Sequence, residues 1–211
     1  YTISQKTINE IFVALSSFYN YLTAEGHTAT NPVLAIKQKS KFIRKSQTSH
    51  TVRRLSETQW QYVLDTAREL ANINPDKHQR TLFVISSLYL MYLRVSELVT
   101  SDRWSPQMND FYQDSYGNWW FKTVGKGNKE RSIAVNADML AALIQWRHYL
   151  GLTPKLPPPD DNHPLVPKLR GHGNVSDTKL IYLIVQNCFN IAIDNLKKNN
   201  ELDEAINLSK A

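Results

Sequence analysis

Apolar side chains recur at helical spacing near the start of the chain. They lie three or four residues apart between residues 8 and 22, at Ile8, Ile11, Phe12, Leu15, Phe18 and Leu22. That spacing places them on one face of an amphipathic helix. Gly26 is expected to end this helix, and Asn31-Pro32 to interrupt the chain after it. A lone helix cannot bury such a face, so it needs other helices as partners.

A second helical pattern starts at Ser56. Ser56 and Gln59 fit a capping box, in which two side chains satisfy free backbone N–H groups at the start of a helix. Apolar residues follow at helical spacing, at Trp60, Val63, Leu64, Ala67 and Leu70. From Leu82 to Val99 the chain is apolar on most faces, which predicts a buried central helix. Arg94 and Glu97 are the charged residues that interrupt it.

The middle of the chain predicts a β-hairpin. Tyr116-Gly117-Asn118 supplies a turn before the aromatic and β-branched run Trp119–Val124. A glycine-rich segment, Gly125–Lys129, separates this run from a second one at Arg131–Val135. Two such runs joined by a short glycine-containing segment are typical of a hairpin.

The remaining pattern is helical. A helix is expected from about Ala137 to Leu150, then a loop with six of the nine prolines, and a last helix after Ser176. The predicted fold class is mainly α with a small antiparallel β-sheet, an α+β arrangement. Tyr89, Tyr92 and Tyr182 fall on apolar helical segments and are expected in the core.

Composition excludes several classes of protein. The 211 residues are 42% hydrophobic and 21% charged, which is typical of a folded globular chain. No uninterrupted apolar run reaches the roughly 18 residues that a membrane span needs, so no membrane partner is expected. The single cysteine, Cys188, cannot form an internal disulfide or a cysteine-rich metal site, and it favours a reducing, cytoplasmic location. No metal or other cofactor is predicted.

Positive charge is concentrated in one segment. The chain has 25 Lys and Arg against 19 Asp and Glu, a net charge of +6. Residues 37–54, here called the basic stripe, hold seven bases and no acid, so the remaining 18 bases and 19 acids nearly balance. The bases of the stripe are Lys37, Lys39, Lys41, Arg44, Lys45, Arg53 and Arg54. The stripe is either a solvated linker or a contact for nucleic-acid phosphates.

Arg94 and Glu97 lie three residues apart in their apolar segment. On a helix this spacing puts both side chains on one face, where they can form a structural ion pair. The same geometry can instead hold the guanidinium fork of Arg94 toward a phosphate. Both interpretations stay open on these residues alone.

The tip of the predicted hairpin carries a second group of cations. Four bases and one acid lie at or beside this tip: Lys122, Lys126, Lys129, Arg131 and Glu130. Glycines flank Lys126, and glycine permits positive φ and a close backbone approach. A lysine in this position can enter a DNA groove or protonate a leaving oxygen. A solvated hairpin turn is the alternative.

Four motifs, in their order along the chain, resemble the tyrosine recombinase (phage integrase) family. The segment "TINEIFVALSSFYNYLTAEGHTATNPV" is similar to the last helix of the family's N-terminal core-binding domain. The segment "RRLSETQWQYVLDTA" is similar to the entry to the family's catalytic domain. The box that bears the first catalytic arginine resembles "LYLMYLRVSELVTSDRW", and the hairpin that bears the catalytic lysine resembles "VGKGNKERSIAV".

The resemblance implies three parts of the chain. Residues 1–36 would be the C-terminal part of a helical, SAM-like core-binding domain, and residues 37–54 a basic interdomain linker. Residues 55–211 would be the N-terminal part of a recombinase catalytic domain, truncated at its C-terminus. The basic stripe would then follow DNA phosphates between two domains.

The resemblance also implies a reaction. Arg94 would bind the scissile phosphate, Glu97 would support the active site, and Lys126 would act as general acid toward the 5′ leaving oxygen. A tyrosine hydroxyl attacks the phosphate to give a 3′-phosphotyrosyl link, and a DNA 5′-hydroxyl then rejoins the strands. The implied activity is site-specific recombination or integration of double-stranded DNA by a tetramer of recombinase protomers. Lys122, Lys129 and Arg131 would contact the DNA.

Two features depart from the family pattern. Leu93 precedes Arg94, where the family has glycine. The family's His-x-x-Arg motif and nucleophilic tyrosine have no counterpart after the matched motifs. The segment from His50 to Arg53 fits His-x-x-Arg, but it lies before Arg94, in the wrong order for the fold. These 211 residues are therefore expected to bind DNA as a monomer and to leave it uncut.

Two other functions stay open from the sequence. The chain could be a non-catalytic DNA-binding regulator built on the same domain, or a helical interaction domain without a nucleic-acid partner. DNA affinity that falls steeply with salt separates the first from the second, because phosphate contacts release counterions.

Overall fold

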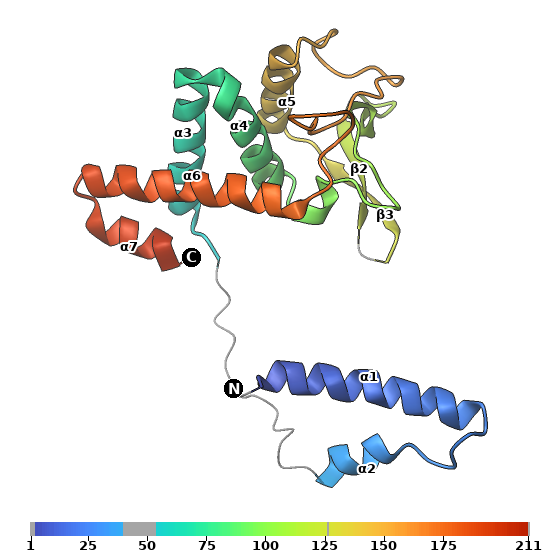
Figure 1. Cartoon of the computed structure of the whole chain (residues 1–211). Helices are drawn as coiled ribbons and strands as arrows, with labels where there is room; N and C mark the ends of the chain where they lie inside the picture. The colour runs from blue at the N-terminus through green and yellow to red at the C-terminus, as the bar shows by residue number, and fades with distance from the viewer. Residues whose placement is uncertain (1–2, 40–53, 126, 211) are drawn as a thin grey trace. The chain divides into compact units, whose positions relative to one another are not determined.

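The computed structural model describes residues 3–39, 54–125 and 127–210. The chain divides into two compact units, Tyr1–Val52 and Arg53–Ala211, and each is described by itself (Figure 1).

The first unit contains a pair of helices. α1 (Gln5–Ala24) begins after Ser4, whose hydroxyl accepts a hydrogen bond from the Thr7 amide at 3.1 Å. α2 (Pro32–Lys39) follows a short loop. The side-chain amide of Asn31 fastens this loop to α1, because it donates to the carbonyl oxygen of Ser16 at 3.0 Å.

α2 was not predicted, since Asn31-Pro32 was expected only to interrupt the chain. Pro32 occupies the first position of α2. An N–H at this position has no partner within the helix, so proline, which lacks one, loses nothing there, and its fixed φ suits a helix. Part of the apolar face of α1 stays open within this unit, with Leu15, Ile11 and Phe18 exposed by 43%, 47% and 55%, while the rest of the face is half-buried. The pair therefore leaves the face for further partners, as the sequence indicates.

In its described part, the second unit has a small sheet at one side of its helices (Figure 1). Its α-helices are α3 (Glu57–Ile73), α4 (Pro75–Leu90), α5 (Ala137–Tyr149), α6 (Thr178–Lys198) and α7 (Leu202–Lys210). The predicted capping box at the start of α3 is confirmed, since the Gln59 amide donates to the Ser56 hydroxyl and the Ser56 amide donates to the Gln59 side chain. α7 was not predicted.

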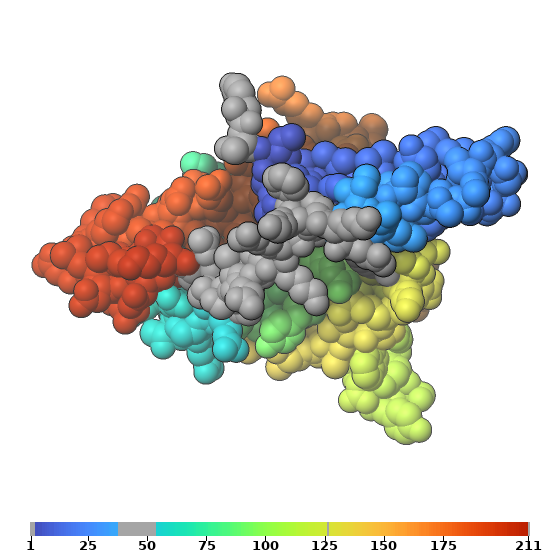
Figure 2. Space-filling model, turned by 90° about the horizontal axis from the view of Figure 1, so that it is seen from below, coloured from blue at the N-terminus to red at the C-terminus, as the bar shows by residue number. Residues whose placement is uncertain are grey.

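The sheet is antiparallel, in the order β1–β2–β3. Its strands are β1 (Phe111–Gln113), β2 (Trp119–Gly125) and β3 (Lys129–Ala134). β2 and β3 confirm the predicted hairpin, whereas the short β1 carries only one buried residue and gives no clear pattern. The segment between β1 and β2 projects in yellow-green in Figure 2. Together with the helices, this sheet confirms the α+β class.

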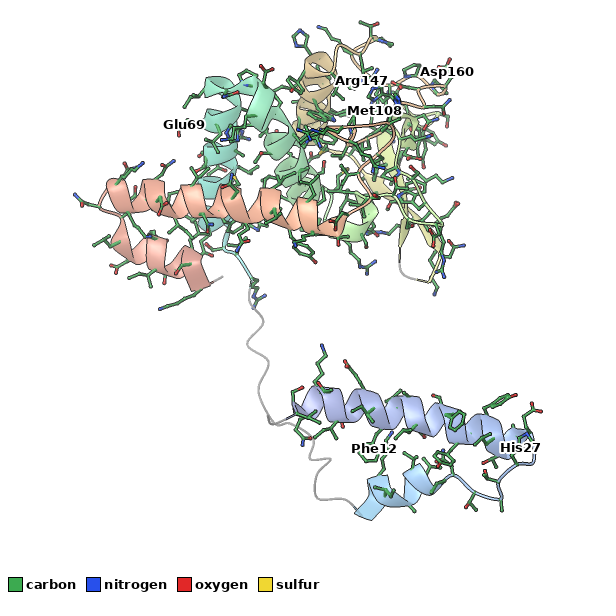
Figure 3. The ribbon with its side chains drawn as sticks, viewed as in Figure 1. Phe12, His27, Glu69, Met108, Arg147 and Asp160 are labelled. Carbon is green, nitrogen blue, oxygen red and sulfur yellow. The ribbon has the colours of Figure 1, made fainter. Side chains whose placement is uncertain are left out.

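Two hydrophobic clusters form the core of the second unit. One joins α4, α5 and the sheet, where the rings of Phe83 and Trp146 stack with centroids 5.2 Å apart. The other lies among α3, α4, α6 and α7 and includes Cys188. The fully buried guanidinium of Arg147 on α5 pairs with Asp161 and donates to the Pro154 carbonyl oxygen at 2.9 Å (Figure 3). Arg147 thereby anchors the proline-rich loop to the first cluster.

The predicted central helix is wrong at its C-terminal end. α4 stops at Leu90, Met91 caps it, and Arg94 has an extended backbone with φ −75° and ψ 148°. A 3₁₀ turn, η1 (Val95–Glu97), follows directly. A continuous apolar run shows burial but does not show where a helix ends, because buried extended segments are equally apolar.

The change of direction after α4 occurs at Tyr92. Its φ of 50° is in the left-handed region that favours glycine. Leu93 is instead a core residue that is 7% exposed, so the glycine-like conformation lies one residue before the position that the sequence singled out. The prediction of core positions is wrong for Tyr92 and Tyr182, which are 79% and 61% exposed. Tyr89 is half-buried and stacks on a tryptophan of α3.

Candidate functional site

Arg94 lies at the surface where the chain passes from α4 to η1. Its side chain is 63% exposed, although the residues on either side of this turn belong to the core. Arg94 has an extended backbone between the end of α4 and the start of η1. A permanently charged guanidinium is thus available to solvent on a short, well-packed segment.

Glu97 lies directly behind Arg94, and only 1% of its side chain is exposed. Its Oε2 accepts hydrogen bonds from the Arg94 backbone amide and from Arg131 Nη2, both at 2.7 Å. Its Oε1 accepts one from Arg131 Nε at 3.3 Å, and Arg94 Nη1 lies 3.6 Å from the same oxygen. A buried carboxylate is costly unless it is paired and hydrogen-bonded, and these contacts satisfy both of its oxygens.

The strand register explains why Arg131 reaches Glu97. Arg131 on β3 lies opposite Thr123 on β2, and directly opposite residues of an antiparallel pair share one face. Thr123 is fully buried, so Arg131 is on the inner face of the hairpin. Lys122 is on the other face, where it pairs with Glu130 at 3.6 Å. Alternation along the strands therefore separates an inward arginine from an outward lysine.

Gly125 ends β2 beside this group of charges. A Cβ atom at Gly125 would lie 3.2 Å from Arg94 Nη1 and 3.3 Å from Glu97 Oε1, closer than an ordinary van der Waals contact. The missing side chain lets the end of the strand pass alongside the two charged groups. Gly125, which directly precedes the predicted catalytic lysine, therefore has a packing role: its lack of a side chain leaves room for Arg94 and Glu97.

A cleft of about 710 Å³ opens beside Arg94. Its walls are the segment after Arg94, the turn between β2 and β3 and the start of α6, and its lining includes Arg94, Thr100, Arg103, Gly125, Gly127 and Thr178. Two arginines and one aspartate are the charged residues among its described lining, which gives the cleft a positive balance. Serine and threonine hydroxyls in the same walls can donate hydrogen bonds to anionic oxygens.

Hydrogen bonds fasten the walls of the cleft to one another. The Thr100 amide donates to the Val175 carbonyl oxygen at 2.7 Å. Asn174 is buried, and its side-chain amide donates to the Leu98 carbonyl oxygen at 3.0 Å. The segment that carries Arg94 and the segment that enters α6 are therefore held as one rigid frame, which suits a site that must present charges in fixed positions.

Sequence reasoning missed Arg103 and the hydroxyl residues of the cleft. Their signal is the polar run Ser101–Ser105, which follows the Arg94 box and contains an arginine and a tryptophan.

Only part of the predicted set meets in space. Arg94, Glu97 and Arg131 form one group, and Lys122 and Lys129 lie on the neighbouring hairpin, with Lys129 exposed. Lys126 lies outside the described residues, but Gly125 and Gly127, the residues bonded to it in the chain, both line the cleft.

The structure leaves most of the basic stripe undescribed. Lys41, Arg44, Lys45 and Arg53 lie outside the described residues, as does the side chain of Lys39. Lys37 is half-buried on α2 of the first unit, and Arg54 is exposed in the second unit. DNA contacts by these residues stay predictions.

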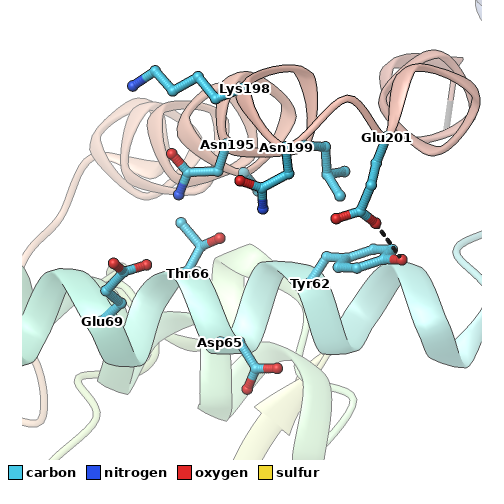
Figure 4. Close-up of a pocket in the computed structure, with 10 residues that line it drawn as sticks. Tyr62, Asp65, Thr66, Glu69, Asn195, Lys198, Asn199 and Glu201 are labelled. Atoms are coloured by element: carbon cyan, nitrogen blue, oxygen red, sulfur yellow. Dashed lines mark hydrogen bonds between the residues drawn. The ribbon is translucent and has the colours of Figure 1, made fainter.

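A second cavity, between α3 and α6, has a different character (Figure 4). It encloses about 320 Å³, and Asp65, Glu69 and Glu201 give its lining an acidic balance. The Tyr62 hydroxyl donates to Glu201 at 3.1 Å, and this hydrogen bond raises the pKa of Tyr62. Carboxylates repel phosphates, so this cavity is a poor candidate for a nucleic-acid site.

No group of three or more His, Cys, Asp or Glu side chains in the described ranges is placed to hold a metal ion. A search of the same ranges finds no helix with the length and hydropathy of a membrane span.

Comparisons with known proteins point to one class of relative. The chain is similar to tyrosine recombinase XerD of Rickettsia bellii, with 28% identity over 148 residues, which are 69% of this chain and 44% of the relative. It is 30% identical to tyrosine recombinase XerD of Rickettsia prowazekii over 141 residues, 67% of this chain and 42% of the relative. The chain thus spans less than half the length of these curated relatives. No family model matches it.

Proposed function

The chain is related to the tyrosine recombinase family, and from this premise we propose that it is part of an enzyme that breaks and rejoins DNA at specific sites. One observation carries the proposal. An exposed arginine, Arg94, stands at a positively charged cleft, and a buried carboxylate fixes its backbone from behind. This arrangement suits the binding of a phosphodiester, whose charge increases on the non-bridging oxygens during transfer.

Arg94 is proposed to hold the scissile phosphate by its guanidinium fork. Lys126 is proposed to give its proton to the 5′ oxygen as the bond to phosphorus breaks. Its two neighbours in the chain line the cleft, and this supports a position near the leaving oxygen. In the complete reaction a tyrosine oxygen bonds to phosphorus while the 5′ oxygen leaves, and the reverse exchange rejoins the strands.

These 211 residues are proposed to bind DNA without cutting it. No tyrosine or histidine lies among the described residues that line the cleft, so the described part of the site has phosphate-binding groups but no tyrosine nucleophile. Residues 1–36 are proposed to belong to a core-binding domain, residues 37–54 to a linker, and residues 55–211 to a catalytic domain with the recombinase fold. Assembly of protomers into a tetramer on DNA is part of the same proposal.

A suicide half-site, a DNA substrate that traps the covalent intermediate, tests the division between binding and cleavage. We expect the chain to shift the duplex in a binding assay at low salt, with affinity that falls steeply as salt rises. We also expect no covalent protein–DNA adduct on a denaturing gel. An adduct would overturn the claim that the nucleophile is missing, and the absence of any salt-dependent binding would overturn the DNA-binding proposal.

The missing tyrosine and histidine among the described cleft residues also favour a second candidate, a DNA-binding regulator built on the same domain. The reading frame of the gene separates the two. A frame that continues into His-x-x-Arg and a tyrosine supports the enzyme, and a stop codon directly after Ala211 supports the regulator.

A further inference from the structure

We propose that Arg131 is a positioning residue, which neutralises Glu97 so that the guanidinium of Arg94 is free to bind a phosphate. This inference rests on the proposed function of Arg94. It differs from a direct contact between Arg131 and DNA, which is the other role that its charge allows.

The first support is the difference between the two arginines that surround Glu97. Arg131 donates from Nη2 and from Nε to the two carboxylate oxygens, at 2.7 and 3.3 Å. Arg94 Nη1 is 3.6 Å from Oε1, beyond the range of a good hydrogen bond. The two-point contact of Arg131 is the stronger form of an arginine–carboxylate pair. Arg131 is therefore the principal partner of the buried charge.

The second support is the exposure of the three side chains. Glu97 is 1% exposed and Arg131 is 40% exposed, whereas Arg94 is 63% exposed. A buried carboxylate attracts any cation within reach, since the effective dielectric constant there is low. Among the residues that the structure describes, the nearest cation that remains without Arg131 is Arg94, whose Nη1 is 3.6 Å from Glu97 Oε1. Arg94 would then turn inward to Glu97 and leave the cleft.

The third support is the route by which the hairpin is joined to Arg94. Arg131 belongs to β3, which pairs with β2, and β2 ends at Gly125 against Arg94 and Glu97. Glu97 also accepts a hydrogen bond from the backbone amide of Arg94 at 2.7 Å, so it fixes the backbone from which the Arg94 side chain extends. Arg131 thus connects the hairpin to the segment that carries Arg94. The Glu97 carboxylate therefore fixes the position of the hairpin relative to Arg94.

A double-mutant cycle on DNA binding separates positioning from direct contact. The affinity of a short duplex is measured over a range of salt concentrations for Arg131→Ala, Arg94→Ala and the double variant. Loss of one phosphate contact lowers the salt slope by about 0.9. If Arg131 acts through Arg94, each single variant loses one such step and the double variant also loses only one. If the double variant loses two steps, Arg131 touches DNA itself and the proposal is overturned.

Lys129→Ala is the matched control, because this lysine is exposed on the same strand and is not hydrogen-bonded to Glu97. If Lys129 binds DNA, its effect adds to that of Arg94→Ala. Arg131→Lys should restore part of the lost affinity, since it keeps the charge but loses the two-point geometry.

A neutral pair guards against a variant that fails to fold. Glu97→Gln with Arg131→Gln removes the buried charge together with its partner and keeps the shapes. Without a carboxylate to attract it, Arg94 stays in the cleft, so this pair should bind DNA better than Arg131→Gln alone. Equal weakness of the two proteins would contradict the positioning role.

The proposed function and the positioning role can fail separately. If Arg94→Ala leaves DNA affinity unchanged, the proposed function of Arg94 fails. NMR of the arginine Nε–H groups then tests the positioning itself. We expect the Arg94 group to exchange rapidly with water in the wild type and slowly in Arg131→Ala, where it would bind Glu97. No change in that exchange would refute the inference.

Discussion

Replacing Tyr92 with glycine distinguishes a helix that ends at Leu90 from one that continues to Val99. Tyr92 has φ 50° and is 79% exposed, so the substitution relieves backbone strain and removes little packing. The left-handed conformation costs a residue other than glycine about 1–2 kcal/mol. Glycine loses about 0.5–1 kcal/mol more conformational freedom on folding. The net effect expected for Tyr92→Gly is a gain in unfolding free energy of about 0–1.5 kcal/mol.

Thermal and urea unfolding followed by circular dichroism measure this change, and 1 kcal/mol corresponds to about 2–4 °C in Tm for a chain of this size. Two controls set the scale. Glu69→Gly, at an exposed position inside α3, should lose about 1 kcal/mol. Leu93→Ala should lose about 2–5 kcal/mol because Leu93 is buried. If Tyr92→Gly is destabilising to the same degree as Glu69→Gly, the chain is helical at Tyr92 and the described turn is wrong.

Three further changes have defined outcomes. Arg103→Ala should weaken DNA binding and lower its salt slope by about 0.9, because Arg103 lines the cleft. Arg68→Ala is the control and should leave the slope unchanged, since Arg68 lies on α3 and pairs with Asp65. Equal slopes for the wild type and Arg103→Ala would show that Arg103 does not contact DNA. Burial raises the pKa of Asp110 from 3.8 to about 6, so the stability that its protonated form contributes below pH 3.8 should be lost as pH rises through about 6. Asp110→Asn should remove this pH dependence in urea titrations, and an unchanged profile would assign it to another group. Burial also raises the pKa of the Cys188 thiol to about 12, so alkylation should be very slow in the native protein and rapid in urea, as mass spectrometry can show.

Local signals in the sequence predicted the elements that depend on local physics. The capping box at Ser56 and Gln59 describes two hydrogen bonds within one turn, and the structure contains both. The hairpin of β2 and β3 follows from two β-branched and aromatic runs around a glycine-rich tip. These features need no knowledge of the rest of the fold.

The site depends on contacts that the sequence pattern cannot show. The three-residue spacing of Arg94 and Glu97 suggested a pair on a helix, but Arg94 is extended and Glu97 lies in a 3₁₀ turn. Arg131 comes from 34 positions further along the chain, and only the strand register places it on the inner face of the hairpin. The sequence identified all three charged residues and the pair of Arg94 with Glu97, but it did not indicate that Arg131 also pairs with Glu97. Which arginine neutralises Glu97 is a tertiary property.

The salt dependence of DNA affinity, compared between Arg94→Gln and the wild type, tests directly whether Arg94 binds a DNA phosphate. Glutamine removes the charge and the fork while the buried pair of Glu97 and Arg131 stays in place. We expect a salt slope lower by about 0.9, which corresponds to the loss of one phosphate contact, with an unchanged Tm. A variant with the wild-type slope and affinity would show that Arg94 does not bind a DNA phosphate, and the central claim would be contradicted.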